Sequence, residues 1–189
     1  MTNYKFVITK NKDELAVRSS EIIISLLNEF LNEKDRVQIA LSGGSTPSAV
    51  YKLLSKSLIP WDRVDVFLGD ERWVDLDDES SNSLMIRNTL LSSHPGSRAC
   101  FHCVPTTELS TPEASAEHFQ QLLKQKCIGN PPIFDLMLLG LGDDGHTASL
   151  FPGDKVLHIR EKFVSTSVGK GLDRITFTIP LLNSARNVV

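Results

Sequence analysis

The polar stretch that best suits chemistry is Gly142–Thr147, which reads Gly-Asp-Asp-Gly-His-Thr. It directly follows Phe134–Leu139, an almost wholly apolar run that is typical of a buried central strand. Because imidazole exchanges protons near neutral pH, His146 can serve as a general acid or base. Asp144 is close enough in sequence to orient this ring or to hold its charged form. We therefore expect acid/base catalysis here, and the alternative is that Gly145 and His146 only stabilise a turn.

A second polar loop, Gly69–Arg72, follows the apolar segment Val64–Leu68. The guanidinium of Arg72 can bind a phosphate through paired hydrogen bonds or polarise a carbonyl group. Asp70 or Glu71 can orient it. Taken alone, the segment is better explained as a solvated charge cluster. The acidic run that follows also fits a solvated loop better than a cation site, because its carboxylates show no regular ligand spacing: Asp75, Asp77, Asp78 and Glu79.

A third loop, Ser42–Pro47, lies between the apolar segment Val37–Leu41 and a helical pattern. Glycines let backbone N–H groups approach a ligand closely, and the start of a helix favours an anion. The loop therefore predicts a phosphate cradle, formed by Ser42, Gly43, Gly44, Ser45 and Thr46. A tight turn followed by an ordinary helix cap at Ser45 or Thr46 explains the loop equally well. Neither nucleotide-binding glycine pattern is matched, which disfavours nucleotides.

Apolar strands and amphipathic helices alternate along residues 37–150, which predicts an α/β fold with a mainly parallel sheet and helices on both faces. Ligands of such sheets bind beyond the carboxyl ends of the strands, where all three loops are expected to meet. Two further strands are expected near the carboxyl terminus. The expected strands cover 37–41, 64–68, 100–104, 134–139, 163–168 and 174–179, and the helices cover 13–33, 46–54, 81–91 and 111–129.

Length, composition and charge exclude several classes of function. The 189 residues have a formal net charge of -3 and a pI near 5.9, so they offer no bulk attraction to nucleic acid or to an anionic membrane. No apolar run is long enough to span a bilayer, and the first twelve residues show no export signal. We therefore expect a cytoplasmic protein.

Cysteines are three in number, Cys100, Cys103 and Cys127, which fits reduced thiols better than a disulfide framework. Cys100 and Cys103 form a CxxC pattern without a second pair. Buried structural thiols explain it better than zinc binding or redox chemistry. No metal site is expected from these residues.

Taken together, four blocks of the sequence resemble the 6-phosphogluconolactonase family, within the wider group of sugar-phosphate isomerases and deaminases. They occur in the family's order over nearly the whole chain, and the block containing Asp-Gly-His-Thr-Ala-Ser-Leu-Phe-Pro is the most specific. The blocks are 41–47, 68–72 with Ser81 and Asn82 downstream, 139–152, and 174–180 with Leu182 and Asn183.

The resemblance implies hydrolysis of 6-phospho-D-glucono-1,5-lactone to 6-phosphogluconate, in the oxidative pentose phosphate pathway, without a metal or organic cofactor. The ligand is then a small sugar-phosphate lactone, and we expect a monomer or a weak homo-oligomer. His146 becomes the acid/base and Arg72 a substrate anchor, and together with Asp144 they are the expected catalytic residues. The expected substrate-binding residues are Ser42, Gly43, Gly44, Ser45, Thr46, Asp70, Asn82, Gly145, Lys170 and Arg174.

The sequence departs from the family pattern in two places. Gly169–Asp173 replaces a Lys-Pro-Pro-like stretch, and Lys170 and Arg174 are expected to face the phosphate from this altered loop. Family members also continue for some tens of residues beyond Asn183. We therefore expect a single lactonase-like domain over residues 1–189 that lacks a terminal strand and helix.

Two alternatives stay open at this point. An aminosugar-phosphate isomerase or deaminase of the same fold group also uses a Ser-Gly-Gly loop and an Asp-Gly-His turn, but the Gly-Asp-Glu-Arg segment at 69–72 differs from the Asp-Glu-Tyr typical of those enzymes. A non-catalytic sugar-phosphate sensor is the other alternative. Against it, the chain has no DNA-binding helix pair and retains His146 and Arg72.

Overall fold

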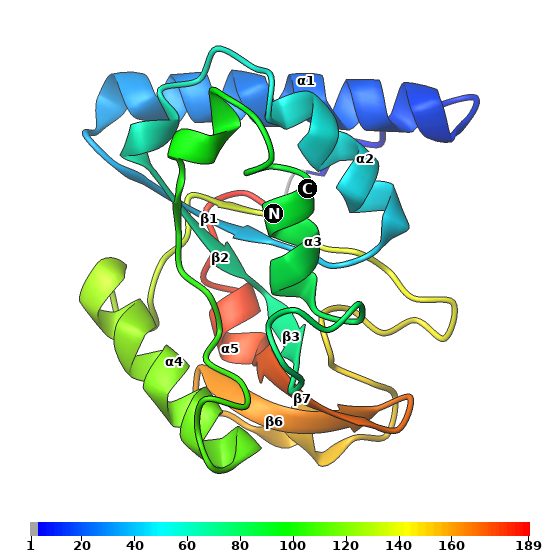
Figure 1. Cartoon of the computed structure of the whole chain (residues 1–189), viewed down its shortest axis with the longest axis vertical. Coiled ribbons are helices and arrows are strands. Elements are labelled where there is room, and N and C mark those ends of the chain that lie inside the picture. The colour runs from blue at the N-terminus through cyan, green and yellow to red at the C-terminus, as the bar shows by residue number, and fades with distance from the viewer. Residues whose placement is uncertain (1–3) are drawn as a thin grey trace.

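The computed structural model describes residues 4–189 and has a four-stranded parallel sheet at its centre (Figure 1). Neighbouring strands pair in parallel, and Leu41 at the end of β1 lies opposite Leu68 at the end of β2. Both strands are buried along their whole length, as their apolar sequences require. In spatial order the strands are β4 (Cys100–Phe101), β2 (Val64–Leu68), β1 (Val37–Leu41) and β5 (Leu136–Met137).

Helices flank this sheet, which confirms the expected α/β class. The longest, α1, begins after Asn11, whose side chain caps it by accepting a 2.8 Å hydrogen bond from the Glu14 N–H. None of the helices within residues 4–189 combines the length and apolarity of a membrane span. The helices are α1 (Lys12–Glu33), α2 (Ser45–Leu54), α3 (Asn82–Asn88), α4 (Pro112–Lys126) and α5 (Ile179–Leu182), with short 3-10 turns at Trp61–Arg63, Gly96–Arg98 and Lys155–His158.

A second sheet of three antiparallel strands lies beside the parallel one, at the bottom of the view in Figure 1. Its order is β3 (Asp70–Arg72), β7 (Leu172–Phe177) and β6 (Val164–Gly169). The prediction of a loop at residues 69–72 was therefore wrong, because pairing with β7 converts this segment into a strand. The two carboxyl-terminal strands exist as expected, but they belong to this second sheet.

Aromatic packing joins the two sheets. Phe134 of the parallel layer packs on Phe67 at 5.5 Å and on Phe177 of β7 at 5.4 Å between ring centroids. Backbone hydrogen bonds through Gly69 also connect the two sheets. The Gly69 N–H donates to the Leu41 carbonyl at 2.9 Å, and the Gly69 carbonyl accepts from the Phe177 N–H at 2.8 Å. The antiparallel sheet is thereby fixed at the carboxyl edge of the parallel one, where ligands of α/β proteins bind.

Several boundaries and exposures differ from the predictions. The strands β4 and β5 are shorter than expected, and α3 ends at Asn88 instead of Leu91. Cys127 is buried, but Cys100 is exposed, so the expectation of buried thiols in the CxxC pattern was wrong for Cys100. Residues 187–189 run parallel to β5, with Val188 bridging to Met137, so they add to the parallel sheet.

Candidate active site

The loops after β1 and β2 and the segment after β5 meet at the carboxyl edge of the parallel sheet. Gly43 lies against the Asn82 side chain, and a Cβ atom at residue 43 would be 2.2 Å from Asn82 Oδ1. Glycine is therefore required for this approach. On the other side, Ser149 Oγ donates a 2.6 Å hydrogen bond to Asp70 Oδ2. These contacts bring the three predicted loops to one place.

Two arginines lie side by side on neighbouring strands of the antiparallel sheet. Arg72 of β3 is the direct register partner of Arg174 of β7, and directly opposed residues of antiparallel strands project from the same face. Arg174 is only 6% exposed. Burial, followed by the nearby charge of Arg72, lowers the pKa of Arg174. Such a like-charge pair is unfavourable in isolation, so it favours an anion between or beside the two guanidinium groups.

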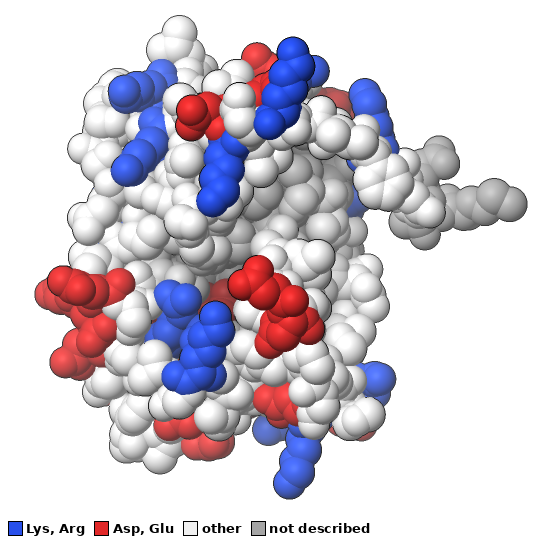
Figure 2. Space-filling view, turned by 90° about the vertical axis from the view of Figure 1, so that its right-hand side faces the viewer, with Lys and Arg blue, Asp and Glu red and all other residues white. Residues whose placement is uncertain are grey.

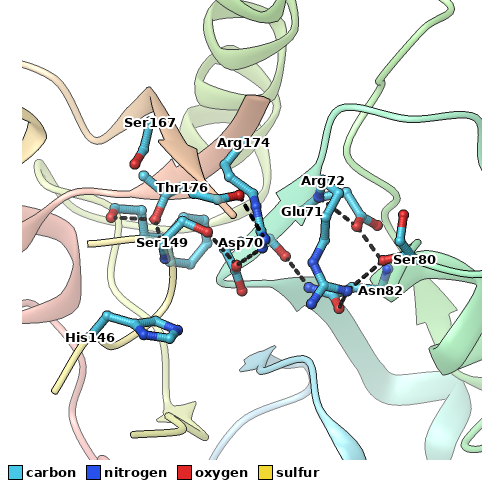
Figure 3. Close-up of polar contacts among 12 residues, drawn as sticks. Asp70, Glu71, Arg72, Ser80, Asn82, His146, Ser149, Ser167, Arg174 and Thr176 are labelled. Carbon is cyan, nitrogen blue, oxygen red and sulfur yellow. Dashed lines mark hydrogen bonds and ion pairs between the residues drawn. The ribbon is translucent and has the colours of Figure 1, made fainter. Parts of the chain in front are cut away.

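Among the described residues, the hydrogen bonds of the Arg72 guanidinium are made by Nη1. Its Nη1 donates to the carbonyl of Ser80 and, at 2.7 Å, to Asn82 Oδ1. The Asn82 amide in turn donates to the carbonyl of Asp70 at 2.9 Å. Arg72 Nε is buried without a hydrogen-bond partner in the described chain. Figure 3 shows the resulting fixed arrangement of Arg72, Asn82 and Asp70.

The Arg174 guanidinium is held even more loosely. Its Nη2 donates to the carbonyl of Gly169 at 3.2 Å, and its Nη1 lies 3.9 Å from Asp70 Oδ2. That same oxygen already accepts from Ser149, and Arg174 Nε has no partner among the described residues. A buried donor of this kind costs free energy unless a ligand or water satisfies it. We interpret Arg72 and Arg174 as an arginine pair open to an anionic ligand.

The Glu71 carboxylate does not neutralise the charge of the two arginines from their own face of the sheet. Glu71 precedes Arg72 on β3, and neighbouring strand residues project from opposite faces. Its fully buried carboxylate accepts hydrogen bonds from the backbone N–H groups of Arg72, Asn82 and Ser83, at 2.8, 2.7 and 2.7 Å. Burial raises its pKa despite these bonds. Glu71 therefore fixes the start of α3, and with it Asn82, beside Arg72. The sequence did not distinguish this structural role from that of Asp70.

His146 lies at the same edge with one ring nitrogen engaged. Its Nδ1 contacts the carboxylate of Asp144, and this hydrogen bond keeps the pKa of Asp144 below its usual value. With Nδ1 engaged, Nε2 is the nitrogen left for a substrate. A side chain on Gly142 would overlap the ring, since its Cβ would be 2.1 Å from His146 Nδ1. The glycine before the two aspartates thus makes room for the imidazole.

Phe151, which the sequence analysis did not select, links the histidine to the arginine pair. Its ring centroid lies 4.6 Å from that of His146 and 5.9 Å from Arg174 Cζ. The acid/base candidate and Arg174 therefore border one apolar surface. In Figure 3 the His146 ring points toward the side of the cluster where Asp70 and Asn82 lie.

The first turn of α2 carries the remaining predicted residues. The cap is Gly44, with φ at 113°, and no side chain caps the helix, so the prediction of a cap at Ser45 or Thr46 was wrong. The first N–H groups of α2 are therefore not satisfied by a side-chain cap, and Ser45 and Thr46 are exposed. Ser42 Oγ is buried without a partner among the described residues. These features favour the cradle over the ordinary cap.

Two predicted binding residues lie away from the hydrogen-bonded cluster. Lys170 is exposed at the tip of the β6–β7 hairpin, with φ at 53°, and Gly145 is exposed in the turn before His146. Figure 2 shows the charge distribution on one face of the molecule: basic side chains gather beside a hollow, with acidic side chains on both sides of it.

The fold and the site together define a class: an α/β protein with a pair of adjacent arginines and an imidazole at the carboxyl edge of its parallel sheet. Residues 10–189 match the family model described as "Glucosamine-6-phosphate isomerases/6-phosphogluconolactonase". The chain belongs to this family, which confirms the resemblance seen in the sequence.

Relatives and solved structures agree with this assignment. A 6-phosphogluconolactonase of Nostoc sp. is 38% identical over 185 residues, which are 96% of this chain and 77% of the relative. One of Synechocystis sp. is 40% identical over 182 residues, covering 95% and 75% of the two chains. The crystal structure of a 6-phosphogluconolactonase from Shewanella baltica superposes with a TM-score of 0.87 at 30% identity, over 95% of this chain and 77% of that one.

Proposed function

We propose that this chain hydrolyses 6-phospho-D-glucono-1,5-lactone to 6-phospho-D-gluconate. The observation that carries the proposal is the pair of the half-buried Arg72 and the buried Arg174, with open donors, beside an imidazole that a carboxylate holds by Nδ1. The relatives named 6-phosphogluconolactonase support the choice of substrate.

In this proposal Arg72 and Arg174 bind the phosphate group. A phosphate dianion matches two guanidinium charges and supplies acceptors for the donors that the chain leaves unpaired. Asn82 and Asp70 position the two arginines. The N–H groups of residues 43–46 face the same edge and stabilise negative charge on the substrate.

His146 performs the proton transfers. Nε2 takes a proton from water as the water oxygen attacks the lactone carbonyl, and the charge that develops on the carbonyl oxygen is stabilised by backbone N–H groups. The bond between the carbonyl carbon and the ring oxygen then breaks, and His146 returns the proton to that oxygen. Asp144 keeps Nδ1 protonated and stabilises the imidazolium. General acid/base catalysis of this kind contributes about 10²–10⁴-fold.

The test is a hydrolysis assay on lactone made freshly from glucose 6-phosphate by its dehydrogenase, with 6-phosphogluconate measured by a coupled reaction. The spontaneous opening of the lactone is measured in parallel and subtracted. The proposal predicts a rate that is proportional to protein concentration. Ammonia release from glucosamine 6-phosphate would indicate the isomerase activity also named for the family. Tight binding of 6-phosphogluconate without turnover would indicate a sensor.

A further inference from the structure

A cluster of metal-ligating side chains lies at the opposite end of the parallel sheet from the candidate active site. Asp65 is the second residue of β2, and its direct register partner is Cys100, the first residue of β4. The pairing continues, because the His102 N–H donates to Val66 O at 2.9 Å. Residues two apart on a strand share a face, so the parallel register places Asp65, Cys100 and His102 together on one side of the sheet.

The donor atoms of these three side chains converge. His102 Nε2 lies 2.9 Å from Asp65 Oδ1 and 3.6 Å from Cys100 Sγ, and all three atoms lie within 4.8 Å of one another. A tetrahedral zinc ion with ligands at about 2.0–2.3 Å holds its donor atoms roughly 3.3–3.8 Å apart. The distances between the donor atoms of Asp65, Cys100 and His102 lie on both sides of this range or within it. Small side-chain adjustments therefore suffice to admit an ion.

Neighbouring side chains fix the orientation of Asp65 and of His102. Asp65 Oδ2 accepts from Arg36 Nε at 2.8 Å and from Gln38 Nε2 at 3.3 Å, and Oδ1 contacts both Arg36 Nη2 at 3.3 Å and His102 Nε2 at 2.9 Å. The His102 ring stacks on Phe67, with centroids 4.6 Å apart and an interplanar angle of 19°. Hydrogen bonds and packing that orient ligands in this way are typical of metal sites.

We infer that Asp65, Cys100 and His102 bind one divalent metal ion, zinc by preference, with water completing the coordination. A thiolate, an imidazole and a carboxylate form a donor set that suits zinc. Cys100 is exposed, so the ion has a path from solvent. Because β4 is the outer strand next to β2, the ion would fasten the edge of the sheet. The site is separate from the proposed hydrolysis, since it lies at the amino-terminal ends of the strands.

The competing explanation is an ion pair between His102 and Asp65 that needs no metal. That ion pair is made by Asp65 and His102, with the Cys100 thiol 3.6 Å from His102 Nε2, so dependence of Zn²⁺ binding on the thiol distinguishes the two explanations. His146 and Asp144 form another imidazole–carboxylate pair that can bind zinc weakly, so the titration is made in the His146→Ala background.

The test is a Zn²⁺ titration of the reduced, chelator-stripped full chain against a chromophoric chelator. We expect one Zn²⁺ per chain. Cys100→Ser and His102→Ala should each weaken binding at least about tenfold, by comparison with losses of about 10–100-fold on removing outer-shell partners. Cys103→Ser, a neighbouring thiol outside the cluster, should leave the affinity unchanged. Far-ultraviolet circular dichroism checks that each variant folds.

A second readout uses Co²⁺ in place of Zn²⁺. The inferred site predicts a thiolate-to-cobalt charge-transfer band in the near ultraviolet that disappears in Cys100→Ser and persists in Cys103→Ser. Absence of stoichiometric Zn²⁺ binding, or binding that Cys100→Ser leaves unchanged, would overturn the inference. Neither result would bear on lactone hydrolysis, which is measured separately.

Discussion

The hydroxyl of Ser149 donates a 2.6 Å hydrogen bond to Asp70 Oδ2, the same carboxylate oxygen that lies 3.9 Å from Arg174 Nη1. This bond ties the segment after β5 to β3, two parts of the chain that are 79 residues apart. Because Ser149 occupies this oxygen of Asp70, Arg174 makes only a long ion pair with it. The guanidinium therefore keeps N–H donors for a ligand.

From this relationship we predict that Arg174→Ala raises KM for the phosphorylated lactone about 10–100-fold with a smaller effect on kcat. A hydrogen bond to a charged group contributes about 1.5–3 kcal/mol, which corresponds to that range. The measurement is steady-state hydrolysis corrected for spontaneous opening. Arg160→Ala, at an exposed residue outside the site, is the matched control and should keep the wild-type KM. An unchanged KM in Arg174→Ala would argue against phosphate binding by this residue.

Asp144→Asn tests the orientation of the imidazole. The hydrogen bond with His146 lowers the pKa of Asp144, so the carboxylate stays ionised throughout the neutral range and continues to hold Nδ1. We expect kcat to fall roughly tenfold or more in the variant, since acid/base catalysis contributes about 10²–10⁴-fold when the ring is correctly held. Asp143→Asn, one residue earlier in the same turn and also exposed, is the control. Equal activities of the two variants would contradict the proposed role of Asp144.

Tyr51→Phe tests how α2 fixes the predicted cradle. The buried Tyr51 hydroxyl accepts from the Ser42 N–H at 3.0 Å and donates to the Ser42 carbonyl at 2.8 Å. Its loss leaves two buried backbone groups unpaired, so the free energy of unfolding should fall by about 1–3 kcal/mol in urea denaturation. KM should rise as the loop shifts. Tyr4→Phe, at an exposed tyrosine, should change neither quantity.

Cys127→Ala tests the effect of burial on stability at alkaline pH. Burial raises the pKa of the Cys127 thiol from its usual value of 9.0 to about 12. Between these values the folded chain keeps the proton and the unfolded chain loses it, so the free energy of unfolding falls as pH rises. The wild-type curve should therefore decline more steeply than that of Cys127→Ala, by about 1.4 kcal/mol per pH unit. Parallel curves in urea denaturation at several pH values would contradict this.

The strands and helices of the parallel layer could be predicted from the sequence because each is marked by residues close together in the chain. The apolar runs of β1 and β2, the helix start at Thr111 and the polar turns that follow the strands are each visible within a few residues. The contact between His146 and Asp144, two residues apart in one of those turns, could be predicted for the same reason.

The second sheet was not predictable in this way. The strand β3 has only three residues, all charged, and it forms because β7 pairs with it from about a hundred positions further along the chain. The alignment of Arg72 with Arg174 follows from that tertiary register. The contact of Ser149 with Asp70 and that of Phe151 with His146 arise from the same packing, so no local pattern signalled them.

The most direct test of the whole account is lactone hydrolysis by His146→Ala and the wild-type chain, compared at equal concentration after subtraction of spontaneous opening. The account predicts a wild-type rate well above background and a loss of about 10²–10⁴-fold in the variant. Binding of 6-phosphogluconate, followed by thermal shift, should persist in the variant because the arginine pair is intact. Wild-type turnover by His146→Ala would contradict the assignment of His146 as the acid/base.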